Sequence, residues 1–277
     1  MRKLFMYWWN TKSNIGDEAS YYIVSRLFNG KIIHKKPFLT IRELARQLLK
    51  QKRIPEFREF VFPWTRVLFG VGSILDYAGK NDIVWGSGFR EDSSKTACTD
   101  FRLVRGNLTR KKIGCPSVKI GDPVLALPSF YKPKKKQLKF PITIIPHYTE
   151  YQYFNNLYSS SYNVLKIESK DVETFVDSVA NSEYVLSTSL HGIIIAHAYG
   201  VPVVWIKKGY IKSSDFKFYD YFSSVGVRCE RPLTNIEEIL KNEDSVKKTF
   251  DDFKENYQVN VDLKKIQLDI LESFPVM

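Results

Sequence analysis

Residues 183–206 (EYVLSTSLHGIIIAHAYGVPVVWI) constrain the fold of this chain more than any other stretch. They are typical of a short strand, a tight turn with N-cap residues at Ser187–Ser189, a helix, and a buried parallel strand at Val201–Ile206. His191 and Gly192 fall where the helix opens from the first strand. Free N–H groups and the helix dipole favour anions at such a place. A titratable imidazole there indicates chemistry on a negatively charged substrate.

The same alternation of apolar strand, polar turn and helix recurs along the chain and predicts an α/β fold. A strand at Leu4–Trp9 leads into a helix at Asp17–Phe28. We expect further strands at Val67–Val71, Ile83–Trp85, Phe101–Val104, Val118–Ile120, Ile142–Ile145 and Val164–Ile167. We expect further helices at Ile41–Lys50, Ile74–Ala78, Val172–Val179, Phe216–Phe222, Ile236–Leu240, Val246–Tyr257 and Leu263–Leu271.

Three prolines and a lysine run between Pro128 and Pro141 predict a domain boundary. We therefore divide the chain into a Rossmann-like domain at 1–130, a basic linker at 131–140, and a second Rossmann-like domain with C-terminal helices at 141–277. Open α/β sheets bind ligands beyond the carboxyl ends of their strands. The active site is therefore expected in the cleft between the two domains.

The formal charge of +12 favours nucleic acid, an acidic membrane surface or a polyanionic small substrate as partner. The run at Lys132–Lys139 is either a solvated linker or a weak docking surface for anionic lipid. No apolar run reaches the roughly 20 residues of a membrane span, and the N-terminus is typical of a strand rather than a signal peptide. We expect a cytoplasmic protein, with the inner face of the plasma membrane as its docking surface.

Metal and disulfide chemistry is not expected. The three cysteines, Cys98, Cys115 and Cys229, are far apart with no CxxC motif, and the chain has four histidines without an acidic triplet.

Polar residues follow several of the predicted strands. Asn14, Gly16 and Asp17 follow the first, where they either bind a ligand or only cap the helix. Arg105 ends another strand and can hold a carboxylate or phosphate with two donors, or pair with a neighbouring carboxylate. Further candidates at strand ends are Gly86, Ser87, Gly88, Asp122 and His147. His197 lies within an apolar helix and is expected to be a hydrogen-bonded core residue.

Several motifs together resemble the polysaccharide pyruvyl transferase family. They occur in the family's order and span most of residues 14–222. The matching segments are NIGD at 14–17, GSG at 86–88, VRGNLTR at 104–110, GDPVLALP at 121–128, IIPHY at 144–148 and SLHGIIIAHAYGVP at 189–202.

The resemblance implies a two-domain arrangement like that of GT-B glycosyltransferases. It implies transfer of the enolpyruvyl-derived carbons of phosphoenolpyruvate onto two sugar hydroxyls as a cyclic ketal, with no cofactor. Arg105 and His191 match family residues that contact the donor, and Ser189, Leu190 and Gly192 share the latter's motif. Many members have an arginine where this chain has Ser189. The missing charge must come from Lys217, Lys207 or Arg110.

The chemistry requires an acid and a base. His191 is the candidate that protonates the donor's methylene carbon, and Asp17 or Asp122 would deprotonate the acceptor. We expect the second domain to bind the donor and the first to bind the acceptor. The predicted acceptor-binding residues are Asn14, Gly16, Gly86, Ser87, Gly88 and His147.

The acceptor is expected to be a lipid-linked or free oligosaccharide, and Tyr151, Tyr153 and Phe154 are expected to be exposed for it. Two other functions compete with this one. A nucleotide-sugar-dependent GT-B glycosyltransferase would also place an anionic donor in the cleft. A non-enzymatic basic module for nucleic acid or membrane would explain the charge, yet it leaves the strand-end residues unexplained, and no nucleic-acid motif is present.

Overall fold

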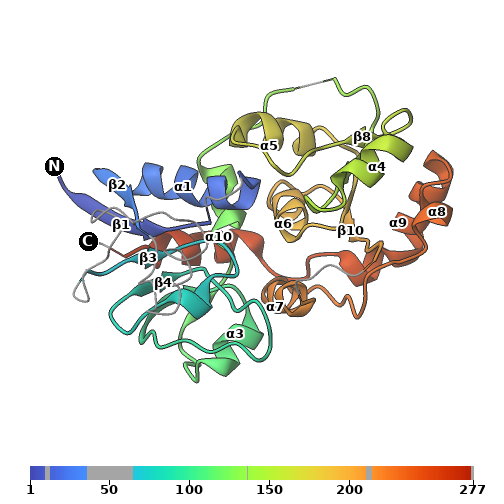
Figure 1. The fold of residues 1–277 in the computed structure, drawn as a ribbon. Coiled ribbons are helices and arrows are strands. Elements are labelled where there is room, and N and C mark those ends of the chain that lie inside the picture. Colours follow the sequence, from blue (N-terminus) through green and yellow to red (C-terminus); the bar gives the residue numbers. More distant parts are fainter. Residues whose placement is uncertain (10–12, 36–64, 136, 210–213, 276–277) are drawn as a thin grey trace, which may run out of the picture.

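A computed structural model describes residues 1–9, 13–35, 65–135, 137–209 and 214–275 and shows an α/β protein with two parallel sheets (Figure 1). The first sheet has six strands in the order β2-β1-β3-β4-β5-β6, and neighbouring strands in it pair in parallel. Its strands are β1 (Lys3–Tyr7), β2 (Lys31–His34), β3 (Leu68–Phe69), β4 (Ile83–Trp85), β5 (Asp100–Val104) and β6 (Lys119–Ile120). The predicted helix at Ile41–Lys50 lies outside the described residues.

The second sheet has four parallel strands in the order β10-β9-β7-β8. They are β7 (Ile142–Ile145), β8 (Asn163–Val164), β9 (Tyr184–Ser187) and β10 (Val203–Trp205). The strand predicted at Val164–Ile167 is wrong in extent. The strand ends at Val164, and the carbonyl of Ile167 instead accepts a hydrogen bond of 3.0 Å from the backbone N–H of Ile15. We call the six-stranded sheet with its helices the first half of the molecule, and the four-stranded sheet with its helices the second half.

Helices follow the strands as the alternation predicts. Asn14 caps the first helix, since its Oδ1 accepts from the N–H of Gly16 at 3.1 Å. The α-helices are α1 (Ile15–Leu27), α3 (Asn107–Lys112), α4 (Tyr151–Tyr158), α5 (Val172–Ala180), α6 (Leu190–Ala198), α7 (Phe216–Val225), α8 (Ile236–Ile239), α9 (Glu243–Tyr257) and α10 (Leu263–Glu272). Short 3₁₀ turns form η2 (Leu75–Tyr77) and η3 (Pro123–Ser129). Within the described residues, no helix has the length and apolar character needed to cross a membrane.

The last helix, α10, returns to the first sheet, whereas α8 and α9 lie at the opposite end of the molecule (Figure 1). The indole of Trp85 donates to the carbonyl of Ile270 at 3.1 Å, and Lys119 forms an ion pair of 2.7 Å with Asp269. Residues 263–272 therefore pack with the first half, although they follow the second half in sequence. The division at 1–130, 131–140 and 141–277 stays a prediction.

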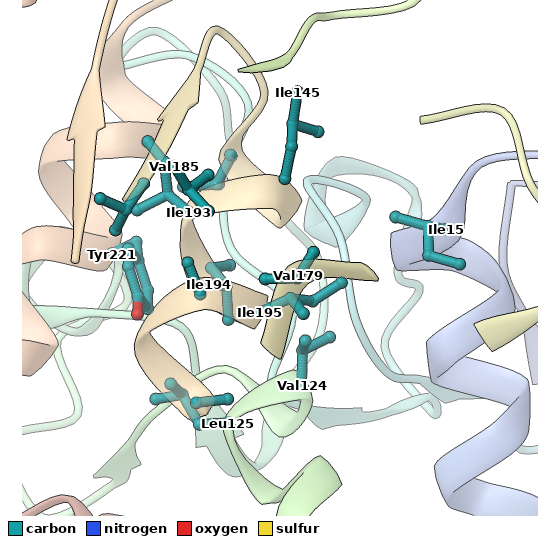
Figure 2. Close-up of a cluster of buried hydrophobic side chains, with 14 of the residues drawn as sticks. Ile15, Val124, Leu125, Ile145, Val179, Val185, Ile193, Ile194, Ile195 and Tyr221 are labelled. Carbon is teal, nitrogen blue, oxygen red and sulfur yellow. The ribbon is translucent and has the colours of Figure 1, made fainter. Parts of the chain in front are cut away.

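The two halves share one continuous apolar core. Figure 2 shows Val124 and Leu125 of η3 beside Ile194 and Ile195 of α6. All four of these side chains are fully buried. The apolar face of α6, which the sequence places in the second half, therefore holds η3 of the first half in a fixed position.

Candidate active site

The carboxyl edges of the two sheets meet at the first turns of α1 and α6. A Cβ atom placed on Gly16 would lie 2.0 Å from Nδ1 of His191, so the α1 backbone lies directly against the imidazole. The turn after β1 thereby reaches the turn after β9. The predicted acceptor-side residue Gly16 and the predicted donor-side residue His191 lie together.

His191 carries an imidazole nitrogen that nothing satisfies within the described part of the chain. Part of the residue remains accessible, yet Nε2 is shielded and has no hydrogen-bond partner. Burial, with the neighbouring charges of Lys217 and Arg105, lowers the pKa of His191 to about 3. The ring is therefore neutral at pH 7 in the ligand-free protein, and an anion placed beside it would raise its pKa.

Asp17 has the opposite shift. Burial raises the pKa of Asp17 to about 8, although a backbone hydrogen bond from Trp9 partly offsets this, and Glu18 adds to the rise. At pH 7 the carboxyl is therefore largely protonated. The ligand-free protein holds its proton on Asp17 and not on His191, the reverse of the predicted acid and base. Both catalytic roles stay predictions.

Lys217 is a cation whose charge affects two of the predicted site histidines. Its positive charge lowers the pKa of both His191 and His147. Burial and the charge of Arg105 lower the pKa of Lys217 to about 8, against the opposing effect of Asp215.

The other two candidate cations are engaged elsewhere. Both oxygens of Asp215 accept from Nζ of Lys207, at 2.8 and 2.7 Å. Arg110 donates to Oδ1 of Asn107 at 2.6 Å. Of the three cations that the sequence offers for the charge missing at Ser189, the structure brings Lys217 to the imidazoles.

Arg105 is fully buried, and its guanidinium is surrounded by acceptors. It pairs with Asp220 at 3.0 Å, donates to Oγ of Ser73 at 2.7 Å, and donates to the carbonyl of Phe89 at 2.7 Å. Asp220 therefore compensates its charge within the protein. A contact between Arg105 and the donor stays a prediction.

Asp122 is fully buried at the start of η3. Its Oδ1 accepts from the N–H of Val124 at 3.0 Å, whereas Oδ2 has no partner among the described residues. Burial raises the pKa of Asp122 to about 6, with Asp220 adding to the rise and Arg105 opposing it. This carboxyl remains mostly ionised at pH 7.

The predicted acceptor residues after β4 are buried and support other parts of the site. A Cβ atom on Gly88 would lie 2.5 Å from the guanidinium of Arg105. Gly86, with a φ of +101°, lies against the ring of Pro123. Ser87 is fully buried. Their contact with an acceptor stays a prediction.

The turn into α6 is held by Ser187, not by Ser189. The hydroxyl of Ser187 accepts from the N–H of Ser189 at 3.0 Å, whereas the side chain of Ser189 makes no capping bond. Leu190 is buried, and a Cβ atom on Gly192 would lie 2.5 Å from Oγ of Ser187. The backbone at the start of α6 is therefore tightly fixed.

His147 follows β7, so it lies at the same carboxyl edge of the second sheet as the turn that carries His191. Its N–H donates to Oγ1 of Thr188 at 2.7 Å. Burial, with the charge of Lys217, lowers its pKa to about 4. His197, by contrast, is buried with Nδ1 at 2.9 Å from the hydroxyl of Tyr221, which confirms the predicted core position.

Two carboxylates near the site were missed by the sequence reasoning. Asp220, on α7, binds Arg105. Glu150, just before α4, has a shielded Oε2 without a partner among the described residues, and burial raises its pKa. Glu150 could have been found from its place shortly after a strand end. Asp220 gives no such signal, because it lies within a helix.

The prediction of exposed aromatic residues on α4 is wrong for Phe154, which is fully buried because it faces the core under the helix. Tyr151 and Tyr153 are partly exposed. The Nζ of Lys208 lies 2.6 Å from the ring centre of Tyr153.

A pocket of substantial volume lies apart from the candidate catalytic residues. A pocket of about 970 Å³ opens beyond β10, and Lys207 is the one predicted site residue in its lining. His191, Asp17 and Lys217, whose pKa values are shifted, lie outside this lining, and with the contact between Gly16 and His191 they define the candidate site. Among the described residues, no group of three or more His, Cys, Asp or Glu side chains could hold a metal ion.

The fold and site define an α/β protein in which strand-end residues from two parallel sheets gather titratable groups and cations in one place. Residues 14–207 match the polysaccharide pyruvyl transferase family, and the chain belongs to that family.

Two relatives show the extent of this similarity. The chain is 32% identical over 191 residues to the succinoglycan biosynthesis protein ExoV of Rhizobium meliloti (strain 1021), which covers 63% of this chain and 58% of that protein. It is 31% identical over 174 residues to the uncharacterized protein L143 of Acanthamoeba polyphaga mimivirus, which covers 58% of this chain and 61% of that protein. The matches thus span about three fifths of these relatives.

Proposed function

We propose that this protein transfers pyruvate from phosphoenolpyruvate to two hydroxyls of a sugar residue in a cell-surface polysaccharide precursor, forming a cyclic ketal and releasing phosphate. The contact between Gly16 and His191 is the observation that carries the proposal, because it joins the two predicted sides of the reaction. Family membership and the similarity to a protein named for succinoglycan biosynthesis support it.

The donor suits the electrostatics of the site. Phosphoenolpyruvate carries a carboxylate and a phosphate, roughly three negative charges near neutral pH, and such groups bind to helix N-termini and fixed cations. The first turns of α1 and α6 meet here, and Lys217 supplies positive charge to the same place. Donor binding would stabilise the imidazolium form of His191, because nearby negative charge favours the protonated ring.

The reaction balances with the groups present. His191 delivers a proton to the methylene carbon of the donor, which leaves a positively charged C2. One sugar hydroxyl attacks C2 and loses its proton. The bond between C2 and the phosphate oxygen then breaks, phosphate leaves, and the second hydroxyl attacks and loses its proton. The products are the ketal and inorganic phosphate.

The protonation states of Asp17 and Asp122 decide which of them can accept a proton from a sugar hydroxyl. At pH 7 Asp17 holds a proton and His191 does not, so on donor binding His191 would take its proton from solution, and Asp17 could act as a base only after losing its own proton. Asp122 is mostly ionised and is the second candidate for accepting a hydroxyl proton.

A GT-B-like arrangement with the site between two domains is part of this proposal. It is supported by the two parallel sheets, whose strand-end turns meet, and by the return of α10 to the first sheet. The acceptor is a lipid-linked or free oligosaccharide. The protein acts in the cytoplasm, where basic residues allow peripheral contact with anionic membrane, and it needs no nucleic acid.

The test is incubation of the protein with phosphoenolpyruvate and p-nitrophenyl β-galactoside, followed by a phosphate assay and mass spectrometry of the sugar. We expect phosphate release and a sugar that has gained one pyruvate ketal. His191→Gln should abolish both, whereas Lys119→Gln, a change in an exposed ion pair on β6, should preserve both. Consumption of a nucleotide sugar without phosphate release from phosphoenolpyruvate would instead establish a glycosyltransferase.

A further inference from the structure

A buried ionic contact joins the two halves next to the site. Arg105 and Thr109 of the first half bind Asp220 of α7, and we call these three residues the α7 clamp. Oδ2 of Asp220 lies 3.0 Å from Nε of Arg105 and 2.7 Å from Oγ1 of Thr109, while Oδ1 accepts from the N–H of Thr109 at 2.8 Å. The side chains of Arg105 and Asp220 are 1% and 0% exposed, so the pair is shielded from water.

The backbone of α7 lies directly on the turn after β5. A Cβ atom on Gly106 would lie 1.7 Å from the carbonyl oxygen of Asp220, so a residue with a side chain would displace the helix. The neighbouring Asn107 donates from its N–H to Oγ of Ser223 at 2.9 Å, and from its amide to the carbonyl of Ser223 at 2.6 Å. The α7 clamp fixes the side chain of Asp220, and these neighbouring contacts fix the main chain of the helix.

Lys217 lies on the same face of the helix as Asp220. Residues three apart in an α-helix are neighbours on one side. The charge of Lys217 acts on His191 and His147 of the second half, and the charge of Arg105 acts on Lys217. A helix fixed at Asp220 thus presents Lys217 to the strand-end histidines.

The guanidinium of Arg105 is held in place for its contact with α7. Asp220 compensates its positive charge within the protein. The absence of a side chain on Gly88 makes room for the guanidinium, because a Cβ atom there would lie 2.5 Å from it.

We propose that Asp220 is a positioning residue that acts through Arg105 and Thr109 to hold α7, so that Lys217 meets the anionic donor. The inference rests on the proposed function, because it names the cation that the donor meets.

The test measures KM for phosphoenolpyruvate and kcat in a double-mutant cycle. Thr109→Val removes the hydroxyl bond to Asp220, together with a longer bond of 3.3 Å from the N–H of Phe89, and preserves the ion pair. It therefore tests the α7 clamp even where Asp220→Asn fails to fold. We expect Thr109→Val and Lys217→Ala each to raise KM on the order of tenfold, the range of coupling energies between contacting residues. In the Lys217→Ala background, Thr109→Val should add little. Lys119→Gln is the control and should leave KM unchanged.

Three results would overturn the proposal. If Asp220 merely screens Arg105 from the donor, Asp220→Asn would lower KM because the guanidinium charge is released. If Thr109→Val raises KM equally with and without Lys217, the α7 clamp does not act through Lys217. If the wild-type chain releases no phosphate from phosphoenolpyruvate, the proposed function itself fails. An active wild type with either of the first two results refutes the α7 clamp alone.

Discussion

Gly16 and His191 touch across the two halves: the α1 backbone lies so close to the imidazole that a Cβ atom on Gly16 would be 2.0 Å from Nδ1. A Cβ atom there would lie 2.0, 2.1 and 2.2 Å from three atoms of the imidazole, so the ring would have to move. The contact sets the separation between the two strand-end turns.

Gly16→Ala should therefore displace His191 and reduce turnover. A displacement of about 1 Å can cost on the order of 100-fold in rate, and we expect a loss of that size in kcat/KM for phosphoenolpyruvate. Gly209→Ala is the matched control, since among the described residues its added Cβ would have no neighbour within 4 Å. Equal activity of both variants would contradict the close approach.

The sequence predicted the position of His191 because strand, turn and helix leave a local pattern, and β9, α6 and β10 confirm that pattern. It also placed Asn14 after the first strand, either as a ligand-binding residue or as a helix cap, and the structure shows that it caps α1. These features depend on neighbours within a few residues. Parallel pairing then brings strand ends to one edge, so a list of strand-end residues already contains much of the candidate site.

The rest depends on partners that are far apart in sequence. Asp220 lies 115 positions after Arg105, inside a helix, and nothing local marks it as a partner. Phe154 was wrongly predicted to be exposed because α4 carries aromatic residues on both its buried and its solvent-facing sides. The proton positions on Asp17 and His191 depend on how deeply each group is buried in the fold, which composition cannot give.

Donor binding should take up a proton at pH 7. The pKa of His191 is about 3 in the ligand-free protein, so the ring starts neutral, and the negative donor raises its pKa. We expect the calorimetric heat of phosphoenolpyruvate binding to differ between phosphate and Tris buffers, whose ionisation heats differ. His191→Gln should remove most of this difference. Identical heats for the wild type in both buffers would contradict this uptake of a proton from solution.

Acid should destabilise the fold through His197. Burial lowers its pKa from 6.5 to about 4, so between these values the unfolded chain binds a proton that the native chain does not. Its contribution to the free energy of unfolding is thus present above pH 6.5 and is lost as the pH falls toward 4, by at most on the order of 3 kcal/mol.

Urea unfolding from pH 7 to pH 4 measures this effect. His197→Gln should lower stability at pH 7, because the bond to Tyr221 is lost, and should flatten the dependence on pH. An unchanged slope in the variant would assign the acid sensitivity to other groups.

Breaking the ion pair of the α7 clamp should be costly. Asp220→Asn leaves the charge of Arg105 buried without compensation, and removing one partner of a buried pair typically costs about 3–5 kcal/mol. Chemical denaturation should show a loss of this order. Arg90→Gln is the control, because Arg90 and Glu91 form an exposed pair at 3.5 Å, and such pairs contribute about 1 kcal/mol or less.

The last prediction concerns the charge missing at Ser189, where many family members carry arginine. Lys217→Ala should weaken phosphoenolpyruvate binding, since the charge of Lys217 acts on His191 more strongly than that of Arg105. Ser189→Arg in the same variant should restore part of the affinity, because the new guanidinium would start from the residue that precedes α6, two positions before His191. The substitution removes no capping bond, since the side chain of Ser189 makes none.

Calorimetric titration of phosphoenolpyruvate into four proteins checks this exchange: the wild type, Lys217→Ala, Lys217→Ala with Ser189→Arg, and Lys217→Ala with Ser159→Arg. Ser159 follows α4, on another element, so an arginine there controls for a gain in net charge alone. Recovery with Ser189→Arg and not with Ser159→Arg would show that Lys217 and the family arginine meet the same part of the donor. Equal recovery of phosphoenolpyruvate affinity in both double variants would show that only the overall charge matters.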